Sequence, residues 1–273
     1  MSRQACWGGA IRSRHLWLRL LIAVVVLIIA LFGTLQAYVK CEVYRAGSLL
    51  AEASGVQIGD TEASALAISK RYGGLGWTPE SLPPKAQWID KDEYEYQVRR
   101  LSDRQYELAI SPFGSFAYRV GRLSDAMRIA REAVPAHWRT ILGMRDWSTR
   151  VELSIREGRV QSVSAMTLVE GREGWVGHTW DLAENMPHHD MRPQAYAIGV
   201  AHLTTADGGG TIIRNFFTPG ASEEEIDAAR SFNHECLTSI TGCGGLCDIA
   251  PRALQYLKQH PDAAWNIIPP QCN

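Results

Sequence analysis

The stretch Phe232–Cys247, FNHECLTSITGCGGLC, holds the residues whose types and spacing are best suited to chemistry. Cys236, Cys243 and Cys247, with His234 beside them, are the ligand types of a structural zinc site and also suit a small disulfide cluster. On a continuous helix His234 and Cys236 stand about 200° apart around the axis, so both cannot face one ion. The pattern therefore favours disulfides, which form outside the cytoplasm, over zinc or free buried thiols.

The disulfide prediction includes Cys272, which lies in the C-terminal tail. With Cys236, Cys243 and Cys247 it allows three pairings. We favour Cys236 with Cys243, because Gly242 can end the helix between them and bring the two Cα atoms within bonding range. Cys247 then pairs with Cys272, which ties the tail to the domain.

A second candidate for chemistry is the loop NMPHHDM, which contains His188, His189 and Asp190 downstream of His178. Imidazole beside the thioethers of the flanking methionines suits copper, so extracytoplasmic copper or zinc binding is one hypothesis for function. The competing interpretation is a solvated turn, because adjacent histidines between prolines are common in such loops. We predict no bound cofactor.

Motifs for catalysis are missing from the sequence. It contains no Gly-x-Ser-x-Gly, no HExxH and no phosphate-binding glycine loop between a strand and a helix. We therefore expect a non-catalytic binding or assembly role in the cell envelope, with metal binding second and an envelope hydrolase third. Trp175 and Trp180, expected in or near loops, are candidate binding residues because exposed rings stack on sugars or anchor protein interfaces.

The first element that the sequence predicts is a helix over an apolar run without a charged residue, Leu20–Val39 (LLIAVVVLIIALFGTLQAYV). At 1.5 Å per residue it spans about 30 Å, the thickness of a bilayer's hydrocarbon core. We predict a cytoplasmic tail over residues 1–19, a transmembrane helix over 20–39, a stalk over 40–58 and a domain over 59–273. The loop-like stretch 73–92 is a candidate subdivision of that domain.

Orientation follows from charge, because the first 19 residues carry four arginines and no acid. Positive flanks stay in the cytoplasm, so the domain is expected outside it, in a bacterial periplasm. An uncleaved signal anchor is favoured over a cleaved signal peptide, because Leu35 and Ala37 do not fit a small-x-small cleavage site. Cys41 then lies just outside the membrane, where we expect it to link a homodimer.

The charge balance of the exported part argues against nucleic-acid binding. The chain has 28 basic and 29 acidic residues, and four of the basic residues are in the predicted cytoplasmic tail. The remainder is therefore acidic overall, whereas nucleic-acid-binding surfaces are basic.

The predicted fold class of the exported part is α+β, with an antiparallel sheet packed by helices. Hairpin patterns occur at 151–169, with Glu157-Gly158 at the turn, and at 196–217, with glycines from Gly208 to Gly210. Ser222 and Glu225 form a capping-box pattern that predicts a helix from Glu223 to Thr241. Asp60 is the expected N-cap of an earlier helix that ends before Gly73.

Overall fold

The computed structural model describes residues 8–77, 103–113, 122–135, 138–139, 142, 144–171, 174–184, 196–205, 208–238 and 245–265. The chain forms two compact units, Met1–Cys41 and Glu42–Asn273. Helix α1 (Gly8–Ser54) contributes to both units. Among the described residues it is the one helix long and apolar enough to cross a membrane, a property that an N-terminal signal sequence shares.

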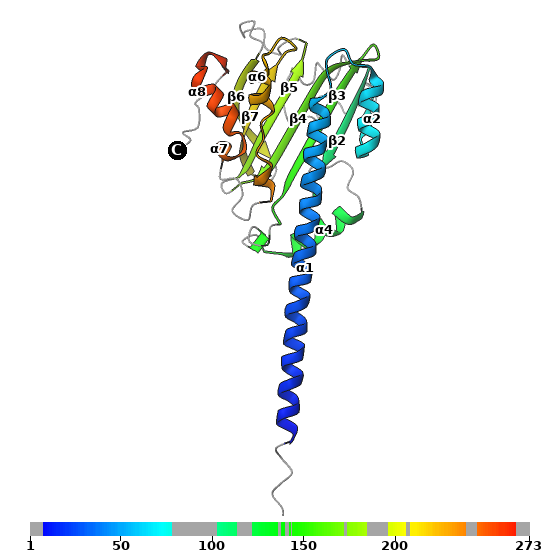
Figure 1. Ribbon diagram of the computed structural model, residues 1–273, viewed down its shortest axis with the longest axis vertical. Coiled ribbons are helices and arrows are strands. Elements are labelled where there is room, and N and C mark those ends of the chain that lie inside the picture. Colours follow the sequence, from blue (N-terminus) through cyan, green and yellow to red (C-terminus); the bar gives the residue numbers. More distant parts are fainter. Residues whose placement is uncertain are drawn as a thin grey trace, which may run out of the picture. The chain divides into compact units, whose positions relative to one another are not determined.

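The second unit is α+β and is built on one mixed sheet (Figure 1). The described strands follow the order β1-β2-β3-β4-β5-β7-β6-β8. Their bounds are β1 (Leu75–Trp77), β2 (Arg104–Ile110), β3 (Trp147–Arg156), β4 (Arg159–Glu170), β5 (Trp175–Ala183), β6 (Tyr196–Thr205), β7 (Gly208–Phe217) and β8 (Ala264–Trp265).

Both predicted hairpins are present. Strands β3 and β4 pair antiparallel around Glu157-Gly158, which have φ of 54° and 70°, the left-handed pair that a two-residue hairpin turn requires. Strands β6 and β7 also pair antiparallel, but Gly208–Gly210 lie inside β7 and not at the turn, where the sequence predicts them. The prediction of a purely antiparallel sheet is wrong, because β5 pairs with β7 in parallel and β6 pairs with β8 in parallel.

Helices cover one face of this sheet and close a single apolar core over it. The covering elements are the Glu42–Ser54 part of α1, α2 (Glu62–Tyr72), α6 (Glu223–Arg230), the 3₁₀ helix η3 (His234–Leu237), α7 (Leu246–Ile249) and α8 (Pro251–Gln259). The N-cap of α2 is Thr61 rather than the expected Asp60, and the C-cap is Gly73 in the left-handed conformation, as predicted. The 3₁₀ helix η4 (Pro261–Ala263) leads into β8.

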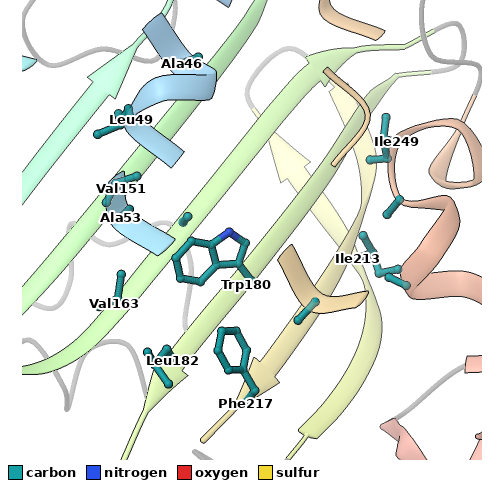
Figure 2. Packing of buried hydrophobic residues seen from close by; sticks show 14 of the residues in the cluster. Ala46, Leu49, Ala53, Val151, Val163, Trp180, Leu182, Ile213, Phe217 and Ile249 are labelled. Carbon is teal, nitrogen blue, oxygen red and sulfur yellow. The ribbon is translucent and has the colours of Figure 1, made fainter. Parts of the chain in front are cut away.

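The segment predicted as a stalk is part of the domain core. Ala46, Leu49 and Ala53 on α1 are fully buried, and Figure 2 shows them beside Val151 and Val163 of the sheet. A stalk was expected because a short segment after a membrane span has no local signal for packing. The apolar face of this helix instead completes the core of the sheet.

The opposite face of β2 and β3 carries a buried ionic cluster. Glu107 on β2 stands directly across from Glu152 on β3. Arg150 lies 2.9 Å from the Glu107 carboxylate and also pairs with Glu152, which accepts a 2.7 Å hydrogen bond from Gln105. The arginine thereby compensates two carboxylates that would otherwise repel each other at facing positions.

Candidate functional site

A groove of about 410 Å³ lies where α6 ends and α8 begins. We call it the Arg230 groove; its lining residues are Asp227, Arg230, Ser231, Phe232, Asn233, His234, Pro251 and Arg252. The predicted helix from Glu223 to Thr241 would have filled this space. The groove exists because α6 ends at Arg230 and the chain continues in an extended conformation.

Asn233 holds the chain in this turn. Its backbone N–H donates to Ile249 O at 2.9 Å, and its side-chain Nδ2 donates to Asp248 O at 3.0 Å. Its Oδ1 accepts from the backbone N–H of Glu235 at 3.2 Å and so caps η3. These bonds join the segment after α6 to α7, and they replace the helical hydrogen bonds that a longer α6 would have made.

Arg230 is the central cation of the groove. Its guanidinium carbon lies 5.1 Å from the ring centroids of both Trp180 and Phe217, which Figure 2 shows side by side on β5 and β7. Its Nε is buried and has no hydrogen-bond partner among the described residues. Burial lowers the pKa of Arg230, but a guanidinium stays protonated in proteins, so the groove keeps a positive charge.

The other charged pair of the groove is already balanced. Arg252 on α8 lies 2.6 Å from the carboxylate of Asp227 on α6, and both side chains are largely exposed. Such a pair holds the groove's rim together but adds little net field. The described lining therefore has one uncompensated positive charge, that of Arg230.

His234 adds a second polar group to the groove. Its ring packs edge-on against Phe232, with centroids 5.1 Å apart. Burial lowers the pKa of His234, so the imidazole is neutral at pH 7, and its Nδ1 is buried without a partner among the described residues. The ring also lies near Gly47 of α1, where an added Cβ would be in ordinary van der Waals contact with His234 Cε1 at 3.9 Å.

A buried polar network lies behind Phe232. The ring of His178 on β5 is 5.8 Å from the Phe232 ring, and Asn215 Nδ2 on β7 is 3.3 Å from His178 Nε2. Tyr196 on β6 donates its hydroxyl to Asn215 Oδ1 at 2.8 Å. Burial lowers the pKa of His178 to about 4, against the raising effect of its hydrogen bond to the Ala229 backbone.

The structure describes only part of the predicted metal site and all of the predicted tryptophan site. His178 is 2% exposed, whereas His188, His189 and Asp190 lie outside the described residues. The described residues hold no group of three or more potential metal ligands. The expectation of loop tryptophans is wrong for Trp175 and Trp180, which lie within β5 and are 7% and 2% exposed. Trp180 packs in the main core, and Trp175 packs with Leu168 and Ile212 in a separate cluster.

The cysteines divide into two kinds. Among the described cysteines, Cys41 is free and exposed, and Cys236 and Cys247 are not among the free ones. Cys236 is buried in η3, with its Sγ 3.5 Å from Asp248 O. Cys243 and Cys272 lie outside the described residues, so both the disulfides and their pairing stay a prediction.

One signal in the sequence points to the break after α6, although the apolar stripe of this region predicts an uninterrupted helix. Asn233 followed by Glu235 is a helix-start pattern, and it indicates a new helix where the apolar stripe predicts continuation. Arg230 itself has no local signal, because its role depends on the rings of β5 and β7. Comparison with protein-family models, with curated proteins and with solved structures finds no match.

Proposed function

We propose that this chain is a single-pass membrane protein with a cytoplasmic N-terminus, and that its extracytoplasmic domain binds a carboxylate-bearing ligand in the Arg230 groove. The binding is non-catalytic, in keeping with a binding or assembly role in the cell envelope. The apolar, uncharged run of residues 20–39 and the arginines that precede it support the anchor and its orientation.

The uncompensated guanidinium of Arg230 carries the proposal. A half-buried cation is costly unless an anion pairs with it, and the described residues offer its Nε no partner. Trp180 and Phe217 contact the guanidinium with their rings, and no hydrogen bond or ion pair with a described residue uses its terminal Nη groups, which we propose as the donors to a ligand. A carboxylate matches the fork of guanidinium N–H donors and the single positive charge.

The walls of the groove indicate what is attached to that carboxylate. Phe232 and Pro251 contribute apolar surface, and neutral His234 offers an imidazole nitrogen. An anion on an apolar or aromatic body satisfies both kinds of surface, as a short acidic peptide or a polymer-linked acid would. A strongly hydrated inorganic anion uses the charge but leaves the apolar wall unfilled.

Benzoate is a suitable probe, since it combines a carboxylate with a planar apolar ring. The full chain in nanodiscs is titrated with benzoate and with uncharged benzamide while the Arg side-chain and backbone NMR signals are followed. We expect millimolar binding of benzoate, weaker binding of benzamide, and at least about tenfold weaker benzoate binding in Arg230→Met.

Arg252→Met is the matched control, because it removes an arginine of the same groove that is already paired and exposed. It should change benzoate affinity by less than about threefold. Equal losses in Arg230→Met and Arg252→Met, or binding of benzamide as tight as that of benzoate, would contradict carboxylate recognition by Arg230.

The anchor and its orientation have their own test. Carbonate extraction should leave the full chain in the membrane fraction, and an amine-reactive reagent that cannot cross membranes should label residues after Val39 but not the N-terminal tail. Non-reducing electrophoresis tests the dimer: a dimer band that disappears in Cys41→Ser supports the linkage. A monomer under oxidising conditions rules it out.

A further inference from the structure

Large apolar side chains are exposed at a few places in the second unit. Among its described residues they are Tyr44 on α1, 77% exposed, Ile129 on α4 (Arg122–Ala133), 61% exposed, and Trp138 just after α4, 47% exposed. The other exposed large apolar residues lie between Trp17 and Phe32 in the apolar part of α1. Exposed apolar groups that gather in one region mark an interaction surface.

Helix α4 is fixed at one end of the sheet. Arg131 on α4 donates from Nε to Met144 O at 3.1 Å and from Nη2 to the Glu170 carboxylate at 2.8 Å. Met144 precedes β3 and Glu170 ends β4, so α4 lies at the end of these strands opposite the Glu157-Gly158 turn. Figure 1 shows α4 at this lower end of the sheet.

The start of the second unit lies toward the same end. The chain just after α1 is bonded to the other end, where Gly59 N–H donates to Val160 O at 2.9 Å beside the β3–β4 turn. Glu42 precedes Ser54 by 12 residues of helix, or about 18 Å. Residues 42–46 of α1, which include Tyr44, are therefore displaced from the turn toward the α4 end.

We infer that the α4 end of the domain, with Ile129 and Trp138, contacts the lipid surface. The inference rests on the proposed anchor, because the apolar run ends at Val39 and the second unit begins at Glu42, three residues or at most about 11 Å of chain later. The headgroup layer is about 5 to 8 Å thick on each side, so a connection this short keeps the start of the second unit at the membrane surface.

The chemistry of the surface fits that partner. Tryptophan and tyrosine rings favour the interface between headgroups and acyl chains, and Ile129 adds an apolar side chain that can enter it. Arg128 on α4 and Arg139 after it supply positive charge for anionic headgroups, although Arg128 also pairs with Glu132 at 3.0 Å.

A depth measurement tests the inference on the full chain in nanodiscs of phosphatidylethanolamine and phosphatidylglycerol. A nitroxide is attached at Ile129→Cys in a Cys6→Ser, Cys41→Ser background, and its relaxation by oxygen is compared with that by a water-soluble nickel chelate. The matched control is Ala63→Cys on α2, an exposed helical position at the turn end of the sheet. We expect the Ile129 label to be severalfold better protected from nickel than the Ala63 label, and a label at Trp138→Cys to behave like it.

Equal nickel accessibility at positions 129, 138 and 63, in a chain that co-purifies with the nanodiscs, would overturn the lipid contact and leave the anchor intact. A chain that fails to co-purify with nanodiscs would overturn the anchor and the contact together. The two failures are therefore distinguishable in one preparation.

Discussion

Nδ2 of Asn215 lies 3.3 Å from Nε2 of His178 in the core, and the same amide nitrogen donates to Thr179 O at 2.8 Å. The His178 ring also bonds to the backbone of Ala229. This network joins β5, β7 and α6 directly behind the Arg230 groove. Because burial keeps this histidine neutral, the free energy of unfolding of the protein depends on pH.

Acidification should destabilise the protein through His178. Its pKa is about 4 in the folded state and about 6.5 in the unfolded chain. Between these values the unfolded chain binds a proton that the folded chain does not, so this group lowers the free energy of unfolding by about 1.4 kcal/mol per pH unit as pH falls from 6.5 to 4. Urea unfolding at pH 7 and pH 5 measures the effect. The lowered pKa of His234 acts in the same direction.

The variant His178→Gln should flatten this pH dependence by about 2 kcal/mol between pH 7 and pH 5, whatever its absolute stability. His260→Gln, at an exposed histidine, is the matched control and should keep the wild-type dependence. If His178→Gln and wild type lose the same stability on acidification, His178 is not held neutral by the core.

Truncation of Leu49 should show that the start of the second unit is core. Leu49 is fully buried against the sheet, so Leu49→Ala is expected to lower the free energy of unfolding by about 2 to 5 kcal/mol. Tyr44→Ala, on the same helix but exposed, should change it by less than about 0.5 kcal/mol in detergent. Similar small effects of both variants in denaturant titrations would instead support the stalk that the sequence predicts over residues 40–58.

The capping box of α6 should contribute measurably. Ser222 Oγ accepts from the Glu225 backbone N–H at 3.3 Å, and the Glu225 carboxylate accepts from the Ser222 backbone N–H at 2.6 Å. Ser222→Ala is expected to cost about 1 kcal/mol in thermal or denaturant unfolding. Ser222→Asp keeps a capping oxygen and should remain close to wild type, so an equal loss in both would exclude the cap as the cause.

Removal of Arg150 should be severe, because it leaves Glu107 and Glu152 facing each other while buried. We expect Arg150→Met to lower the free energy of unfolding by about 3 kcal/mol or more. Glu152→Gln added to that variant should recover part of the loss by removing one charge. Arg156→Met, at an exposed arginine 4.0 Å from Glu157, is the control and should be near neutral.

The correct parts of the sequence prediction rest on interactions between neighbours in the chain. Two hairpins, the capping box at Ser222 and the left-handed Gly73 each depend on a few adjacent residues. The pairing of β5 with β7 depends instead on contacts between residues distant in sequence. The next strand in the chain, β6, follows β5 after a connection of more than ten residues, yet β7 is the strand that pairs with β5. No local pattern distinguishes that order from a simple meander.

By itself the sequence determined an apolar helix of membrane-spanning length, an α+β domain and the positions of its hairpins, since hydrophobic period and turn chemistry are local properties. Only the tertiary structure decided that α6 stops at Arg230, that Trp180 is a buried platform, and that residues 42–54 belong to the core. The physical reason is competition: Asn233 exchanges helical hydrogen bonds for bonds to Asp248 and Ile249, and Arg230 gains two aromatic rings from distant strands. Such partners are set by the fold, so the groove they form appears only once the chain has packed.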